Sequence, residues 1–262
     1  MRGVTPVDRL PDGVTLIRAP NPGPMTLDGT NTWVLRPPGA AGALVVDPGP
    51  DDPAHLAEIA AHGPVSAILI THGHHDHVEG AARLSELLGG VPVRAADPAH
   101  CVGAPPLTAG VLVLGGREIE VLPAPGHTRD SVCFRTGDAV FSGDTILGRG
   151  TTVVAYPDGD LGSYLDSLTM LTAYPSMLLP GHGPALADCA AAARAYLAHR
   201  RDRLAQVEAA MAAGARTPGD IVDAVYPDID PAIRFAAEAS ARAQLDYLRR
   251  ESPRLPEQLD PL

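Results

Sequence analysis

One ten-residue stretch constrains this chain more than any other. The segment "THGHHDHVEG", Thr71 to Gly80, follows the apolar run "VSAILI" and holds four histidines and an aspartate within six consecutive positions. The apolar run predicts a buried strand, and the pattern from Val78 to Leu88 predicts a helix with one apolar face. We therefore expect the histidines on a strand-to-helix turn, and the fold must bring other parts of the chain to that turn.

Imidazole and carboxylate side chains are typical ligands of zinc and similar first-row divalent metals. His72 and His74 alternate by two, which on an extended backbone directs both rings to the same side. Asp76 and His77 follow on the turn beside them. Four ligands from one short loop cannot complete two metal sites, so further ligands are expected at the ends of other strands.

Three later motifs offer those ligands. "PAPGHTRD" places His127 after a predicted strand, "VFSGDTI" places Asp144 after another, and "LLPGHGP" places His182 in the same way. An isolated histidine is more often a core or surface residue than a ligand, so each motif alone is a weak signal. Taken together and in this order, the four motifs predict a site for two metal ions.

With these motifs, and with "VVDPG" around Asp47, the sequence resembles the metallo-β-lactamase-fold superfamily. The resemblance implies an α+β fold, a four-layer αββα sandwich with two metals at one edge of its sheets. It also implies roles for individual residues. His72, His74 and His127 would bind the first metal, Asp76, His77 and His182 the second, and Asp144 both, while Asp47 would orient a ligand imidazole through a hydrogen bond.

The chemistry expected of such a site is hydrolysis by a metal-bound hydroxide. Two divalent ions lower the pKa of a shared water and stabilise the negative charge that its attack produces. Asp76 and Asp144 are the expected catalytic residues, Asp76 because it can also orient the water or accept its proton. We expect zinc, with manganese or iron as alternatives, because the same ligands accept all three.

The chain is predicted to divide into a catalytic domain, residues 1–188, and a helical C-terminal module, residues 189–262. A long helix should end near Gly214, and "TPGD" from Thr217 to Asp220 is typical of the start of the next helix. Three helices in this order resemble a winged-helix module, although the tail after Glu251 shows no clear wing. The alternative is a helical cap that only packs on the catalytic domain.

The fold alone cannot choose the substrate. The segments "NPGPMTLDGTNTWVL" and "LGRGTT", with the helical C-terminus, resemble a subgroup that includes endoribonucleases acting on single-stranded RNA. In that case Asn31 would donate a hydrogen bond to the substrate, unless "DGTN" is only a turn before a strand. β-Lactam hydrolysis is disfavoured, because the zinc β-lactamases do not carry the bridging aspartate.

A thioesterase is the second hypothesis, because glyoxalase II and certain polyketide-releasing enzymes share this site and also carry a helical segment. The net charge of -11 favours this hypothesis, since a polyanion is repelled by an acidic surface. The chain has no lysine, which argues against a glutathione thioester but not against a thioester on an acyl carrier. The sequence narrowly favours RNA, and a non-catalytic metal-binding scaffold is the third hypothesis.

The remaining sequence features set broader expectations. No stretch resembles a signal peptide or a membrane span, so we expect a cytoplasmic protein without a membrane partner. The three cysteines are far apart and odd in number, which favours free thiols over a disulfide framework. Nothing in the sequence indicates the oligomeric state.

Overall fold

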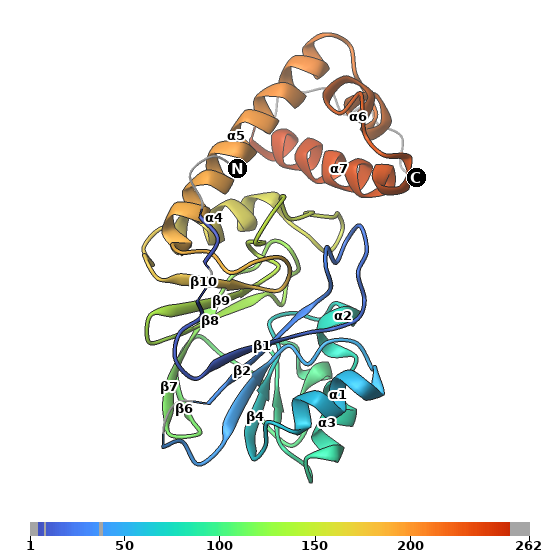
Figure 1. Cartoon of the computed structure of the whole chain (residues 1–262). Coiled ribbons are helices and arrows are strands. Elements are labelled where there is room, and N and C mark those ends of the chain that lie inside the picture. The colour runs from blue at the N-terminus through green and yellow to red at the C-terminus, as the bar shows by residue number, and fades with distance from the viewer. Residues whose placement is uncertain (1–4, 8, 37–38, 252–262) are drawn as a thin grey trace.

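The computed structural model describes residues 5–7, 9–36 and 39–251, and its strands form two five-stranded sheets (Figure 1). The first sheet has the order β1-β2-β3-β4-β5 and the second the order β10-β9-β8-β7-β6, and each contains parallel and antiparallel neighbours. The strands of the first sheet are β1 (Val14–Arg18), β2 (Asn31–Leu35), β3 (Ala43–Val46), β4 (Val65–Leu69) and β5 (Val93–Arg94). Those of the second are β6 (Gly110–Leu114), β7 (Arg117–Pro123), β8 (Val132–Thr136), β9 (Ala139–Gly143) and β10 (Met177–Pro180).

The two sheets pack face to face through a buried apolar layer. Trp33 of β2 contacts Phe141 of β9 edge to face, with ring centroids 6.2 Å apart. Helices α1 (Pro53–Ala60) and α3 (Ala81–Leu87) cover the outer face of the first sheet through residues such as Leu56 and Leu84. Helices α4 (Leu161–Leu171) and α5 (Cys189–Ala212) cover the second sheet. This arrangement confirms the predicted αββα sandwich.

One local expectation was wrong, and one strand was not predicted. The helix predicted from Val78 is two helices, because α2 (His75–Val78) already begins at His75 and α3 starts separately after Gly80. A Cβ at Gly80 would come within 2.8–2.9 Å of Leu56 and of the Pro50 carbonyl, so the chain turns there at close approach to α1 and its preceding loop. Strand β6 was not foreseen, since its run "GVLVL" is short and largely exposed.

The C-terminal module consists of α5, α6 (Pro218–Val225), the 3-10 turn η2 (Pro231–Ile233) and α7 (Arg234–Glu251) (Figure 1). The predicted helix signals are confirmed: Thr217 and Asp220 form a capping box, and Gly214 follows α5 with a positive φ. Residues 189–251 contain no strand, and the tail after Glu251 lies outside the described residues. The winged-helix assignment stays a prediction.

Helix α5 belongs to two cores. Its first half, with Tyr196 and Leu197, packs beside Tyr164 of α4 in the core of the sandwich. Its second half, with Val207 and Ala210, packs against α6 and α7 in a separate apolar cluster. The predicted boundary between residues 188 and 189 stays a prediction, and one continuous helix joins the two parts. None of the described helices is long and apolar enough to cross a bilayer.

Candidate metal centre

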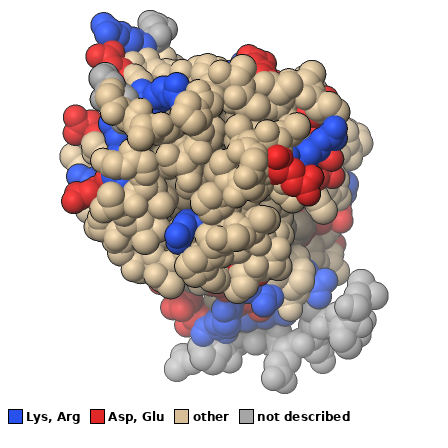
Figure 2. Space-filling model, turned by 90° about the horizontal axis from the view of Figure 1, so that it is seen from below, with Lys and Arg blue, Asp and Glu red and all other residues tan. Residues whose placement is uncertain are grey.

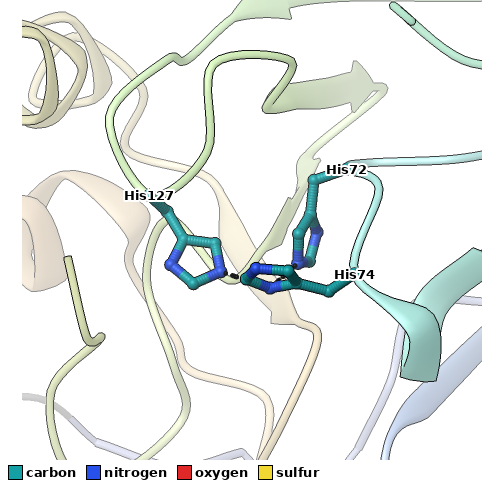
Figure 3. Close-up of side chains that lie close together, drawn as sticks. All are labelled: His72, His74 and His127. Atoms are coloured by element: carbon teal, nitrogen blue, oxygen red, sulfur yellow. Dashed lines mark hydrogen bonds between the residues drawn. The ribbon is translucent and has the colours of Figure 1, made fainter. Parts of the chain in front are cut away.

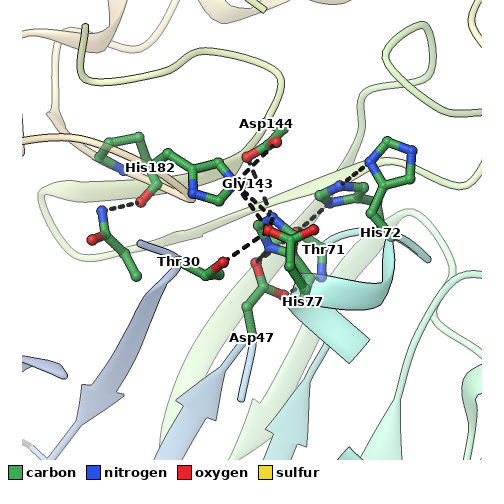
Figure 4. A network of polar contacts seen from close by, with 12 residues as sticks. Thr30, Asp47, Thr71, His72, His77, Gly143, Asp144 and His182 are labelled. Atoms are coloured by element: carbon green, nitrogen blue, oxygen red, sulfur yellow. Dashed lines mark hydrogen bonds and ion pairs between the residues drawn. The ribbon is translucent and has the colours of Figure 1, made fainter. Parts of the chain in front are cut away.

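Four segments that follow strands meet at one edge of the sandwich and bring the seven predicted ligand side chains together. Figure 4 labels four of them, His72, His77, Asp144 and His182. His72 and His74 follow β4, and Asp76 and His77 lie on α2 rather than on a turn. His127 lies in the loop between β7 and β8. Asp144 follows β9 and His182 follows β10, two parallel neighbours in the sheet. Strand ends of this kind place distant parts of the sequence side by side.

Three histidines form the first group, which we call the three-histidine cluster: His72, His74 and His127 (Figure 3). The Nδ1 atom of His74 lies 3.0 Å from His72 Nε2 and 3.1 Å from His127 Nε2. Ligand atoms around one tetrahedral zinc lie about 3.3 Å apart, given Zn–N bonds of about 2.0–2.1 Å. The spacing therefore suits a single ion among the three nitrogens.

Asp76, His77 and His182 form the second group, the carboxylate cluster (Figure 4). His77 Nε2 lies 3.2 Å from His182 Nε2, and Asp76 Oδ2 lies 3.4 Å from His77 Nε2 and 3.2 Å from His182 Nε2. The two rings are buried, whereas Asp76 is only partly so. The spacing again suits one ion.

Asp144 reaches both clusters. Its Oδ1 lies 3.5 Å from His77 Nε2, and its Oδ2 lies 3.4 Å from His182 Nε2 and 3.8 Å from His127 Nε2. Oδ1 is buried and has no hydrogen-bond donor among the described residues. A buried carboxylate oxygen without a partner is costly, so this position fits a bound cation. Gly181 makes room for it, because a Cβ there would clash with Asp144 Oδ1.

Hydrogen bonds behind the clusters fix the rings. His77 Nδ1 lies 2.9 Å from Asp47 Oδ2, and Asp47 also accepts from the backbone N–H and the hydroxyl of Thr71 at 2.8 and 2.7 Å. His127 Nδ1 donates to the Val153 carbonyl at 2.8 Å, and His182 Nδ1 donates to the Gly29 carbonyl at 3.3 Å. Donation from Nδ1 leaves the Nε2 lone pair free for a ligand.

The electrostatics of the two clusters differ. Burial lowers the pKa of His72 well below its usual value and that of His127 to about 4, the latter against the opposing charge of Asp144. Burial also disfavours the charged forms of His77 and His182, but Asp144 and its neighbouring carboxylates outweigh it and raise their pKa values to about 9 and about 10. The carboxylates thus favour positive charge among them, which divalent cations would supply.

Asn31, which was expected to contact the substrate, makes its amide hydrogen bonds within the fold. Its side chain is fully buried, and its amide donates to the carbonyls of Pro180 at 3.0 Å and Gly183 at 2.8 Å. Asn31 therefore braces the loop that carries His182. Its neighbour Thr30 lies at the site instead, because its hydroxyl donates to Asp76 Oδ2 at 2.8 Å.

A cleft of about 580 Å³ opens onto the metal centre at His127 and Asp144. It runs between the loops of the sandwich and the C-terminal module. Much of its wall is apolar and comes from both parts of the chain: Pro24, Met25, Leu27, Leu147, Val153, Ile229, Ile233, Ala236 and Ala237. No pattern in the sequence indicated that the module would line a cleft beside the ligands.

The family profile of the Metallo-beta-lactamase superfamily matches residues 25–101 and 102–182, the region that holds both clusters. The chain therefore belongs to the metallo-β-lactamase superfamily, the class of metal-dependent hydrolase folds that its sandwich and motifs indicate.

Individual relatives cover the C-terminal module as well. The chain is 30% identical to the "Beta-lactamase-like protein 2 homolog" of Caenorhabditis elegans over 266 residues, which covers 94% of this chain and 87% of the relative. It is 29% identical to the "Atrochrysone carboxyl ACP thioesterase" of Aspergillus fumigatus, covering 88% and 79%. A metallo-beta-lactamase family protein of Thermus thermophilus shares the fold with a TM-score of 0.76 at 23% identity, over 93% of this chain and 95% of that one.

Proposed function

We propose that this protein hydrolyses acyl thioesters with the help of two divalent metal ions, and that the cleft beside the metal centre holds the acyl chain. The observation that carries the proposal is the apolar wall, which begins next to His127 and Asp144 and extends over the C-terminal module. Apolar surface in a preformed cleft can pack against an acyl chain, but it offers neither hydrogen bonds nor positive charge to a phosphodiester backbone. The relative from Aspergillus fumigatus, whose name denotes a thioesterase, adds support.

The seven clustered side chains would hold the metals. The three-histidine cluster would bind one ion, the carboxylate cluster the other, and Asp144 would contact both. The ligand types suit zinc, manganese or iron alike. When bound, two such cations acidify water and stabilise the negative charge that develops on a carbonyl oxygen.

The chain's own residues would then orient the attacking water and accept its proton. Among the described residues, the polar contacts of the Asp76 carboxylate use Oδ2, which faces Thr30, His77 and His182, so Oδ1 is the oxygen that can accept the proton of an attacking water. Asp144 keeps the two clusters together. The cleft places the acyl carbon beside His127 and excludes part of the surrounding water.

The RNA hypothesis finds less support. Figure 2 shows the end of the molecule remote from the C-terminal helices, where charged side chains lie mostly along the margins and uncharged residues form most of the centre. The chain as a whole carries a net charge of -11. Cleavage of single-stranded RNA stays a prediction, which the same protein preparation can test.

The test is hydrolysis of acyl N-acetylcysteamine thioesters from acetyl to octanoyl by protein loaded with zinc, manganese or iron in turn. We expect thioester cleavage whose kcat/KM rises with acyl length, because each methylene buried in the cleft contributes about 0.8 kcal/mol. The matched variant is Ile233→Asp, which places a charge on the apolar wall and should remove the length dependence. A fluorophore-labelled unstructured RNA is assayed beside them.

Two other results would overturn the proposal. If the protein cleaves the RNA and does not hydrolyse the thioesters, it is a phosphodiesterase. Two bound metals without hydrolysis of either substrate would instead support the non-catalytic scaffold.

A further inference from the structure

Two arginines of α5 lie in the wall of the cleft without an anionic partner. Arg200 is only 5% exposed, and Arg203 lies one turn further along the helix and is partly buried. Neither forms an ion pair with any carboxylate of the described residues. In both, Nε is buried and lacks an acceptor within that part of the chain.

The contacts that these arginines do make leave their charge uncompensated. Arg200 donates to the carbonyl of Thr152, and its guanidinium lies 5.1 Å from the centre of the Tyr164 ring. Arg203 lies 4.3 Å from the Tyr226 ring and donates to the Gln206 side-chain oxygen at 2.8 Å and to the Val225 carbonyl at 3.3 Å. Neutral acceptors and aromatic rings stabilise a guanidinium in part, but a buried charge without a counter-ion remains costly.

The third arginine that lines the cleft is neutralised. Arg149 pairs through both terminal nitrogens with the carboxylate of Asp28. Three arginines line the cleft. Of these, only Arg200 and Arg203 lack an ion-pair partner in the described part of the chain. Asp144 and Asp228, the acidic residues of the cleft, form no ion pair with Arg200 or Arg203.

The arginines share the cleft with the metal centre. Thr152, whose carbonyl accepts from Arg200, donates its hydroxyl to the Asp144 carbonyl at 2.7 Å. The guanidinium of Arg200 is thus only one residue away from the backbone of a candidate metal ligand. Arg200, His127 and Asp144 all line this one cleft.

We propose that Arg200, assisted by Arg203, binds an anionic group of the substrate and thereby selects among acyl thioesters. Guanidinium groups present fixed donors that match carboxylate and phosphate oxygens. The anion would be a carboxylate at the far end of the acyl chain or the phosphate of a pantetheine arm. This inference rests on the proposed thioesterase function, whose substrate it narrows.

Binding of thioether analogues tests the inference without hydrolysis. The probes are S-pentyl-N-acetylcysteamine, which is neutral, S-(4-carboxybutyl)-N-acetylcysteamine, which carries a carboxylate, and S-pentyl-4′-phosphopantetheine, which carries a phosphate. Calorimetry on the metal-loaded protein should show that at least one anionic probe binds more tightly than the neutral probe. Arg200→Gln should lower the affinity for that probe by about 10- to 100-fold, the usual range for hydrogen bonds to charged groups. The affinity for the neutral probe should not change.

Two further variants separate recognition from support of the loop. Arg200→Lys keeps the charge and should keep part of the preference for the anionic probe. Arg201→Gln removes an exposed arginine next in sequence and should change no affinity. Weakening confined to the carboxylate probe would identify an acidic acyl chain, and weakening confined to the phosphate probe would identify the pantetheine arm.

Two outcomes would overturn the inference. Equal weakening of all three probes in Arg200→Gln would show that Arg200 only braces the loop of Thr152, and unchanged binding would show that it contacts no ligand. Failure of the thioesterase proposal is distinguishable from both. In that case the corresponding thioesters would not be hydrolysed by the wild-type protein, while the anionic thioether would still depend on Arg200.

Discussion

The two clusters of the candidate metal centre are held in different ways. In the carboxylate cluster every side chain has a fixed partner behind it: Asp76 accepts from Thr30, His77 contacts Asp47, and His182 donates to Gly29. In the three-histidine cluster, His74 is exposed, and its hydrogen bonds within the described residues are to the other two histidines. One cluster is built into the sandwich, and the other is completed by a side chain at its surface.

This difference predicts a division of roles. Rings that are fixed before a metal binds lose little freedom on binding, so the carboxylate cluster should retain its ion more strongly. The three-histidine cluster borders the cleft through His127, and we expect its ion to exchange more readily. Substitutions of the ligands, and of the residues that hold the ligands in place, test whether the two clusters differ in this way.

The largest effect is expected for Asp144→Asn, since Asp144 is the residue that both clusters share. The amide removes the negative charge between two cations, so one ion should be lost and thioester hydrolysis should fall by about 10³-fold or more. Metal analysis beside kcat/KM provides the measurement, and Asp158→Asn, an exposed carboxylate, is the control. The comparison predicts that the remaining ion stays at the carboxylate cluster. If the variant retains two ions and full activity, Asp144 is not a metal ligand.

Asp47→Asn should weaken metal binding by about 10- to 100-fold, the usual effect of removing a partner that orients a ligand. Asp47 has a positive φ, which asparagine tolerates, so the variant changes the charge behind His77 with little backbone strain. Competition with a chromophoric chelator measures both affinities, and repeating it in His74→Ala isolates the carboxylate cluster. Asp51→Asn, on the exposed surface, serves as the control. An equal loss of metal affinity at both clusters would contradict the proposed division of roles between them.

The convergence of the seven candidate ligands could be predicted because each motif follows a strand, and strand ends meet at one edge of a sheet. That they bind metal stays a prediction. The buried role of Asn31 could not be foreseen, because "DGTN" is equally typical of an exposed turn. Nor could that of Arg200: in sequence it resembles its exposed neighbour Arg201, and only the packing of α5 on α4, against Tyr164, separates the two.

Removal of one histidine from each cluster compares their contributions to folding. His77→Ala deletes a buried ring and leaves Asp47 Oδ2 without one of its partners, so the free energy of unfolding should fall by about 1–3 kcal/mol. His74→Ala changes an exposed side chain and should change the free energy of unfolding by no more than about 0.5 kcal/mol. Urea denaturation in EDTA measures both. Similar losses for the two variants would show that the clusters are equally built into the fold.

The smallest effect is expected for Thr30→Val, which keeps the shape of the side chain and removes only the hydroxyl that donates to Asp76 Oδ2. Loss of the hydrogen bond to Asp76, worth about 0.5–1.5 kcal/mol, should lower kcat by about 2- to 10-fold, because Asp76 would be less well oriented to accept a proton. The variant also removes the acceptor of the Asn21 side-chain amide, which donates to the Thr30 hydroxyl at 3.0 Å. KM and the content of two metals should not change, since His77 and His182 remain in place. Thr169→Val, on an exposed face of α4, controls for the substitution itself. The contrary outcome is that the variant loses an ion while the kcat of the metal-loaded molecules stays unchanged. In that case the hydrogen bond from Thr30 to Asp76 contributes to the affinity for metal and not to proton transfer.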